Sequence, residues 1–112
     1  MPAAAPHFST IADLGRRLRG GELRAVELAE RLLERIDALD PKLHAFKLVL
    51  RDRALAQARA ADAALAAGAD LGPLHGIPWV AKDLFDVKGH PTTAGTRLLA
   101  NNVARADCAA VR

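Results

Sequence analysis

Residues 76–96 read GIPWVAKDLFDVKGHPTTAGT, and the interpretation of the whole chain depends on this stretch. A short apolar run from Ile77 to Ala81 leads directly into a lysine, Lys82. A short apolar run that follows a turn such as Gly72-Pro73 favours a buried strand. The glycines, prolines and threonines that follow show no periodicity, which is typical of a loop. The sequence therefore predicts a strand over 77–81 with a cation at its end.

A lysine in this position suggests two interpretations. An exposed ammonium stays protonated at neutral pH, so a lysine acts as a base only where dry surroundings or a neighbouring cation favour its neutral form. The residues expected to supply dry surroundings are Trp79, Val80, Leu84 and Phe85. Hydrolases of the Ser-Lys type use a neutral lysine in this way. In the structural interpretation, Lys82 lays its stem on apolar surface or pairs with Asp83 or Asp86.

Composition and charge narrow the classes of protein. The 112 residues are 51% hydrophobic, which suffices for a core and for at most one ordinary domain. The net charge of +3 comes from scattered arginines, and few aromatic residues are available to stack on bases, so a nucleic-acid surface is not favoured. The single cysteine, Cys108, excludes a disulfide framework and a cysteine-based zinc site, and we expect a cytoplasmic protein. Neither an export signal nor a stretch of about 20 apolar residues is present, so no membrane partner is expected.

Two amphipathic helices are predicted before the motif. The first begins near Ser9 or Thr10, either of which can cap free amides, and stops at Gly20-Gly21. The second covers 26–40 and ends at Asp40-Pro41. Their apolar faces consist of Phe8, Ile11, Leu14 and Leu18 in the first helix and of Leu28, Leu32, Ile36 and Leu39 in the second. Each stripe needs a partner surface.

A short strand and a third helix are predicted next. The β-favouring run 46–50 suggests the strand, although periodicity alone leaves a helical start open. Asp52 is expected to cap an alanine-rich helix over 53–70 that ends around Gly68. Because alanine side chains are short, this helix is expected to lie flat on a larger neighbour.

The last residues resemble the start of another helix. Asp107 is a natural N-cap for 108–112, yet barely more than one turn follows it. A turn this short has little hydrogen bonding to offset the cost of nucleation. Together with helical stripes that outnumber the predicted strands, this favours the N-terminal piece of a larger α/β protein.

The stretch around Lys82 closely resembles the start of the amidase signature family. That family carries G-P-L-x-G-I-P-x-x-x-K-D, a short spacer with glycine, and then T-T-x-G-[ST]. The matching residues are Gly72, Pro73, Leu74, Gly76, Ile77, Pro78, Lys82, Asp83, Gly89, Thr92, Thr93, Gly95 and Thr96. The similarity continues upstream at 43–46, LHAF, and downstream over 101–112, so it covers essentially the whole chain. One departure is Arg24, where relatives frequently have a serine cap.

The resemblance implies an α/β fold in which a mixed β-sheet is surrounded by α-helices. Residues 1–112 are expected to be the N-terminal part of a single amidase signature domain, truncated at the C-terminus and mostly helical with a few short strands. The implied activity is that of an amidase, which opens a carboxamide C–N bond through a Ser/cis-Ser/Lys triad and uses no cofactor. Lys82 matches the triad lysine, whereas the segment with both serines is expected beyond residue 112. The chain alone is therefore expected to be inactive.

Other candidate nucleophiles have simpler interpretations. Ser9 is the only serine and is expected to cap a helix. The loop threonines, which are expected to bond local backbone, are Thr92, Thr93 and Thr96. Cys108 has no identifiable histidine partner and is expected to be an inert core residue. His75 and His90 lack metal-ligand spacing, so local loop contacts and no metal are expected.

Two alternative functions remain open. Within the family, the chain also resembles the A subunit of the aspartyl/glutamyl-tRNA amidotransferase, which would make it a glutaminase with partner subunits and tRNA. Outside enzymes, a noncatalytic helical module could use its exposed stripes to dock onto another polypeptide. Under the amidase interpretation the partner is a small-molecule amide substrate, and a homodimer or partner subunits remain open.

Overall fold

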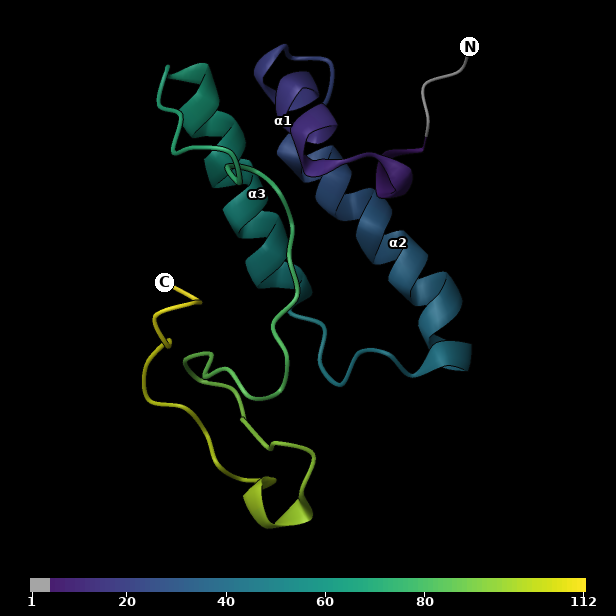
Figure 1. The fold of residues 1–112 in the computed structure, drawn as a ribbon, viewed down its shortest axis with the longest axis vertical. Coiled ribbons are helices and arrows are strands. Elements are labelled where there is room, and N and C mark those ends of the chain that lie inside the picture. The colour runs from purple at the N-terminus through teal and green to yellow at the C-terminus, as the bar shows by residue number, and fades with distance from the viewer. Residues whose placement is uncertain (1–4) are drawn as a thin grey trace. The chain divides into compact units, whose positions relative to one another are not determined.

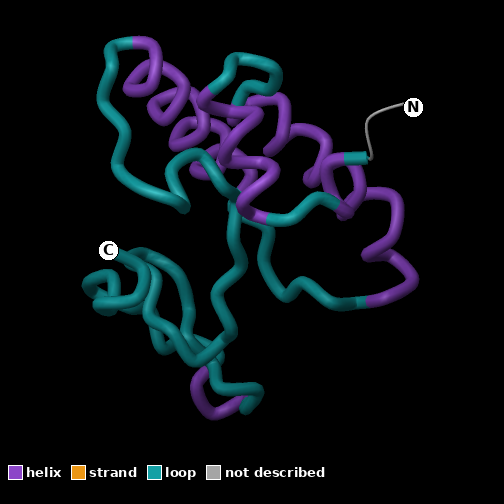
Figure 2. Tube along the Cα trace, turned by 45° about the horizontal axis from the view of Figure 1, so that its top comes forward, coloured by secondary structure: helices purple, strands orange, loops and turns teal. Residues whose placement is uncertain are grey.

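The computed structural model describes residues 5–112, which fold into two compact units. The first unit ends at Pro78 and contains the α-helices (Figure 1). Its elements are η1 (Pro6–Phe8), α1 (Ile11–Arg19), α2 (Ala25–Leu43) and α3 (Arg51–Ala66). The second unit, Trp79–Arg112, consists of loops and turns apart from the short η2 (Arg97–Leu99), as Figure 2 shows.

Helix α1 begins at one of the two predicted caps. Thr10 is its N-cap, and the Thr10 Oγ1 accepts a hydrogen bond from the Asp13 N–H at 3.1 Å. The prediction that Ser9 could cap this helix is wrong, because Ser9 closes η1 by donating its N–H to the Pro6 carbonyl at 3.0 Å. The helix ends at Gly20, as predicted.

Helix α2 continues past its predicted end. Pro41 lies inside the helix, because in its last turn the missing N–H costs only one intrahelical hydrogen bond. The helix ends instead at His44, whose left-handed backbone (φ 50°) donates its N–H to the Asp40 carbonyl. The Asp40 Oδ1 accepts the next free amides, those of Ala45 at 2.7 Å and Phe46 at 3.1 Å.

A carboxylate from α3 caps the start of α2. The Asp62 side chain accepts the N–H of Ala25 at 2.6 Å and that of Val26 at 3.1 Å. The Glu27 Oε2 accepts the Arg24 N–H at 3.1 Å. Negative charge near a helix N-terminus also interacts favourably with the positive end of the helix dipole. The departure at Arg24 is thereby compensated from outside the helix.

Helix α3 packs against α2, as its alanines predicted (Figure 1). Ala58 faces this contact and is only 8% exposed. The prediction that Asp52 caps α3 is wrong: Leu50 occupies the N-cap, and Asp52 lies in the first helical turn. Gly68 follows the helix with φ +81°, a conformation that favours glycine.

The core of the first unit lies between the three α-helices. Its buried members are Leu14, Leu18, Leu23, Ala25, Val26, Leu28, Ala29 and Ala58. The predicted stripe of α2 is buried most at its start: Leu28 is 0% exposed and Leu39 is 37% exposed. On the first predicted face, Phe8 and Ile11 are exposed instead of buried.

Both predicted strands are wrong. Residues 46–50 and 77–81 have no strand in the structure, and between residues 5 and 112 the only β pairing is an isolated antiparallel bridge from Pro91 to Val103. A strand exists only through a ladder with a neighbour, and neither run is paired in this way. Trp79 and Val80 are accordingly exposed rather than buried.

Arg19 ties the segment after α3 to α1. Its guanidinium donates two hydrogen bonds to the Asp70 carboxylate, at 2.6 and 2.9 Å, and a third to the Gly72 carbonyl at 2.6 Å. The hydrogen bond from Arg19, helped by the N–H of Gly72, lowers the pKa of Asp70 to about 2. This bidentate geometry fixes the turn that precedes the motif.

Replacing Asp70 with asparagine is expected to destabilise the first unit in a pH-dependent way. Because the pKa of Asp70 is about 2 in the fold, below its unfolded value of about 3.9, its contribution is complete above about pH 4 and is lost as the pH falls towards 2. Urea unfolding followed by far-UV circular dichroism should separate wild type from Asp70→Asn at neutral pH and bring them together in acid. A separation that stays constant down to about pH 2 would contradict this.

Candidate functional site

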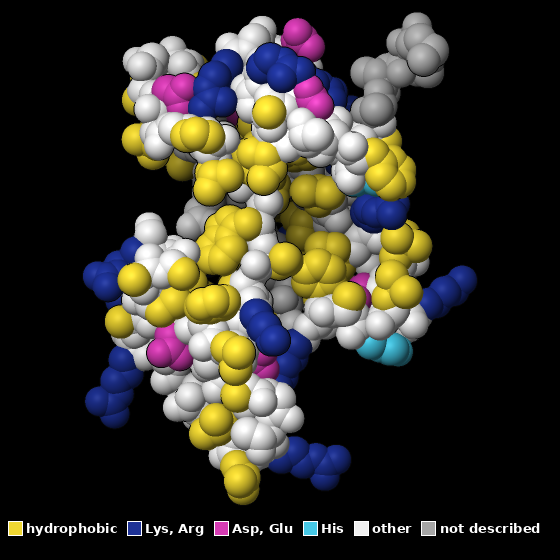
Figure 3. All heavy atoms as spheres, viewed as in Figure 1, with side chains coloured by type: hydrophobic (Ala, Val, Ile, Leu, Met, Phe, Trp, Pro, Cys, Tyr) yellow, Lys and Arg dark blue, Asp and Glu magenta, His cyan; other side chains and the backbone are white. Residues whose placement is uncertain are grey.

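Lys82 lies in a solvent-exposed loop of the second unit. Its carbonyl accepts the Phe85 N–H at 3.0 Å, which closes a tight turn immediately after the apolar run. The surroundings predicted to be dry are open within this chain, because the four residues proposed for them are 45% to 70% exposed. Figure 3 shows hydrophobic side chains at the surface. Those of the second unit are Trp79, Val80, Leu84, Phe85, Leu98, Leu99 and Val103.

Asp83, next to Lys82, is held by the threonine pair of the motif. The Thr93 N–H donates to Asp83 Oδ1 at 2.8 Å, and the Thr93 hydroxyl donates to Asp83 Oδ2. The Ala94 N–H donates to the Asp83 carbonyl at 2.9 Å. Thr93 is only 2% exposed, so its hydrogen bonds to the carboxylate are largely shielded from water. Both the side chain and the backbone of Asp83 are therefore fixed.

Asp86 and Thr92 form a second contact between a carboxylate and a threonine hydroxyl. The Thr92 hydroxyl donates to Asp86 Oδ1 at 2.7 Å, and Thr92 is 8% exposed. The prediction that these threonines bond local backbone is wrong for Thr92 and Thr93, whose hydroxyls bind carboxylates. It is right for Thr96, whose hydroxyl oxygen accepts the Leu98 N–H at 3.3 Å. The hydrogen bonds of Thr92 and Thr93 to ionised carboxylates are stronger than hydrogen bonds between neutral groups.

Residues 102–104 hold the threonine pair from its other side. The Thr92 N–H donates to the Asn102 carbonyl at 3.0 Å, and Asn102 Nδ2 donates to the Thr92 carbonyl at 3.0 Å. The Ala104 N–H donates to the His90 carbonyl at 3.0 Å. The threonine loop is thus anchored on both sides, although the unit has no regular sheet.

The predicted helix after Asp107 is a single turn in the structure. The N–H groups of Val111 and Arg112 both donate to the Cys108 carbonyl, at 3.0 and 3.2 Å. The Asp107 Oδ1 accepts the Lys88 N–H at 2.7 Å, which joins this end of the chain to the motif loop. Cys108 is partly buried.

His75 makes one contact within its own loop, as predicted, and a second contact with α3. It is 8% exposed; its Nδ1 accepts the Leu71 N–H at 3.0 Å, and its Nε2–H donates to the Ala61 carbonyl at 2.9 Å, a tautomer assigned from these partners. Gly76 follows with φ +78°, and a Cβ there would lie 3.2 Å from the Ala25 side chain. Throughout residues 5–112, no cluster of histidine, cysteine or acidic residues is suited to hold a metal ion.

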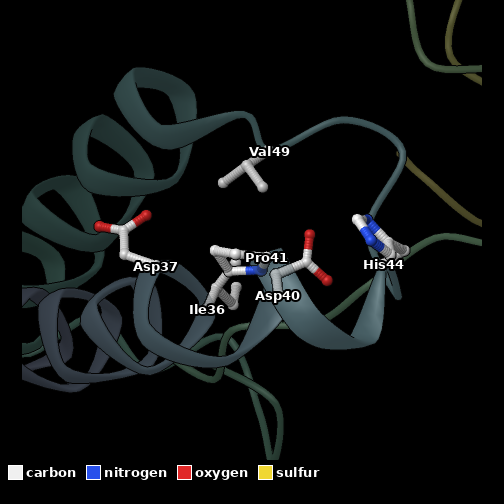
Figure 4. Close-up of a pocket in the computed structure, with 6 residues that line it drawn as sticks. All are labelled: Ile36, Asp37, Asp40, Pro41, His44 and Val49. Atoms are coloured by element: carbon white, nitrogen blue, oxygen red, sulfur yellow. The ribbon is translucent and has the colours of Figure 1, made fainter.

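The pocket in Figure 4 belongs to the first unit and contains no motif residue. It has a volume of about 330 Å³ at the C-terminal end of α2 and is lined by Ile36, Asp37, Asp40, Pro41, His44 and Val49. Its two carboxylates have structural partners: Asp37 binds Arg51 at 2.6 Å, and Asp40 accepts the amides that follow α2. No helix within residues 5–112 combines the length and apolarity needed to cross a bilayer.

Comparison with known proteins adds the family to this geometry. A family model described as Amidase matches residues 27–112, which include Lys82 and both threonines. The chain belongs to the amidase family. Residues 27–78 of the amidase match fall in the helical unit and the remainder form the whole second unit.

Two curated relatives of this amidase-family chain carry the same name. The A subunit of glutamyl-tRNA(Gln) amidotransferase from Streptomyces avermitilis is 49% identical over 90 residues, which are 80% of this chain and 18% of that protein. The protein of the same name from Thioalkalivibrio sulfidiphilus is 46% identical over 105 residues, 94% of this chain and 22% of that protein. The chain therefore spans about a fifth of the length of these relatives.

Two solved structures resemble this amidase-family chain. One is described as "An unexpected vestigial protein complex reveals the evolutionary origins of an s-triazine catabolic enzyme"; it is 34% identical with a TM-score of 0.84, over 88% of this chain and 22% of that one. The other, "Crystal structure of PAM12A", is 37% identical with a TM-score of 0.80, over 91% of this chain and 21% of that one.

The sequence reasoning missed the role of the aspartates. Asp83 or Asp86 was considered only as a possible ion partner in the structural interpretation of Lys82, whereas the structure shows each carboxylate accepting a threonine hydroxyl. The signal was present in the motif, where two acids precede two consecutive threonines. Hydrogen bonds between the threonine hydroxyls and the aspartate carboxylates hold the two ends of this loop together.

Proposed function

We propose that this chain is the N-terminal part of an amidase that cleaves a carboxamide C–N bond, with Lys82 as the lysine of its catalytic triad. The observation that carries the proposal is the family match over residues 27–112, which contains Lys82 in the sequence K-D at the expected place. Lys82 is exposed on an anchored loop, so it can meet groups supplied by other polypeptide, which under this proposal also supplies the dry surroundings that a basic lysine needs. We place both units in one amidase signature domain whose mixed β-sheet includes residues outside this chain.

The proposed reaction passes through an acyl-enzyme. The Lys82 amine accepts a proton from a relay serine as that serine takes the proton of a second, nucleophilic serine. The nucleophile forms an ester bond to the carbonyl carbon, the C–N bond breaks, and the proton passes to the leaving amine. Water then attacks the ester and releases the acid. Both serines belong to polypeptide outside this chain, since the only serine here, Ser9, lies beside η1.

A narrower alternative is the glutaminase component of a tRNA-dependent amidotransferase. Relatives that are 46% to 49% identical carry the name of the A subunit of glutamyl-tRNA(Gln) amidotransferase, which favours this alternative within the same chemistry. Under it the amide is glutamine and the partners are further subunits and tRNA.

An ammonia-release assay tests the proposal. The full-length protein that carries these residues is expected to release ammonia from carboxamides, whereas residues 1–112 alone are expected to stay at the blank, because removing members of a catalytic unit destroys most of its activity. Activity confined to glutamine and dependent on companion subunits would favour the amidotransferase alternative. Turnover by residues 1–112 alone would contradict the proposal that serines outside this chain are needed. A full-length protein inactive on every amide, with and without companions, would contradict the proposed activity and favour a noncatalytic module.

A further inference from the structure

We infer that Asp83 is a positioning residue, which Thr93 fixes so that Lys82 keeps one backbone geometry. The inference rests on the proposed catalytic role of Lys82. Asp83 shares a peptide bond with Lys82, so whatever fixes Asp83 also fixes the point from which the lysine side chain projects. The long lysine side chain is flexible, and a fixed backbone lowers the number of arrangements that it must lose to reach a reacting group.

The contacts of Asp83 restrain it from three directions. Its two carboxylate oxygens accept the Thr93 N–H and the Thr93 hydroxyl, and its carbonyl accepts the Ala94 N–H. The Lys82 carbonyl is engaged separately by the Phe85 N–H at 3.0 Å. The peptide groups that follow Lys82 and Asp83 are therefore both held by hydrogen bonds. The bond from the Phe85 N–H already closes the turn at Lys82, so the bonds from Thr93 and Ala94 to Asp83 are not needed for that purpose.

The backbone after Thr93 is strained in a way that these contacts maintain. Ala94 has φ +47° and Gly95 has φ +73°, and the Thr96 N–H closes the turn on the Thr93 carbonyl at 2.9 Å. Positive φ at both central residues is the pattern of a type I′ turn, which glycine tolerates and alanine disfavours. An alanine in the left-handed region persists only where its surroundings impose that conformation. The Asp83 carbonyl, bonded to the Ala94 N–H, is one such constraint.

The neighbouring pair of Asp86 and Thr92 supplies a matched comparison. Thr92 and Thr93 are adjacent, buried threonines, and each donates its hydroxyl to an aspartate carboxylate. Asp86, however, lies four residues beyond Lys82 and past the turn that the Phe85 N–H closes. Loss of either hydroxyl thus removes a similar bond, but only the bond to Asp83 acts on the residue joined to Lys82.

The test uses Thr93→Val and Thr92→Val in the full-length protein, with kcat and KM for its amide substrate measured for each. Thr93→Val is expected to lower kcat at least about tenfold with KM within about threefold, since small misplacements of a catalytic group are costly. Thr92→Val is expected to change kcat less than about threefold. Thr93→Ser keeps the hydroxyl and should retain most of the wild-type kcat. The double variant Asp83→Asn/Thr93→Val should lose little more than the more severe single variant, as coupled residues do.

The outcomes separate this inference from the proposed function. If Lys82→Met abolishes activity while Thr93→Val and Thr92→Val have equal effects, the positioning role is wrong and the proposed function stands. If Lys82→Met leaves activity intact, the proposed catalytic role of Lys82 fails although amide cleavage stands, and the inference fails with that role. Equal thermal unfolding temperatures of the two valine variants, measured alongside, would show that a selective loss of kcat in Thr93→Val is not a loss of folding. If Thr93→Val alone unfolds, Thr93→Ser decides: wild-type kcat supports the role of the hydroxyl, and a tenfold loss overturns it.

Discussion

Replacing Lys82 with methionine is expected to lower kcat/KM for amide hydrolysis by the full-length protein at least about 10³-fold. Methionine keeps the length of the stem and removes the amine, so the proton of the relay serine has no acceptor. Members of a triad act as a unit, and removing one usually eliminates most of the catalytic acceleration. The measurement is single-substrate kinetics on purified wild type and variant. A variant that retains a tenth of the wild-type kcat/KM would show that Lys82 is not the base.

Lys88→Met is the matched control for this prediction. Lys88 is an exposed lysine in the same unit, and its backbone N–H, which the substitution leaves in place, donates to Asp107. Its variant should retain wild-type kcat/KM within about twofold, as expected of surface substitutions away from special features. Equal losses in both variants would point to charge or folding rather than to a role of the Lys82 amine.

Local rules predicted the helical part of the fold well. The threonine cap of α1, the stop at Gly20 and the alanine packing of α3 follow from residues within one or two turns of each feature. Contacts between distant residues were not predictable in this way. The carboxylate that caps α2 comes from Asp62, 36 and 37 residues away from the amides it accepts, and no local pattern announces it.

The two strand predictions were wrong for the same reason, namely that a strand depends on contacts with distant residues. An apolar run such as 77–81 becomes a strand only if another segment pairs with its backbone, and periodicity does not identify that partner. At the candidate site, the position of Lys82 in a motif could be predicted from the sequence, whereas its exposure to solvent could not. The bonds between Asp83 and Thr93 cross ten residues of loop, so they became visible only in the folded backbone.

Replacing Leu28 with alanine is expected to lower the free energy of unfolding of the first unit by about 2–5 kcal/mol. Leu28 is 0% exposed and lies in the core between the helices, so the substitution removes buried methyl groups and leaves a cavity. Because small domains are stable by only about 5–15 kcal/mol, such a loss should shift the urea midpoint visibly. For residues 1–112 alone, far-UV circular dichroism reports this unit selectively, because the α-helices found in residues 5–112 all belong to it.

Leu39→Ala is the control on the same helix. Leu39 belongs to the same predicted stripe but is 37% exposed, so its truncation removes less buried surface, and alanine favours the helix slightly more. Its loss should stay below about 1.5 kcal/mol. Equal losses at the two positions would mean that α2 is covered evenly along its length, in conflict with the burial that falls from Leu28 to Leu39. A larger loss at Leu28 would instead place the energetic centre of the unit where α1, α2 and α3 meet, at the start of α2.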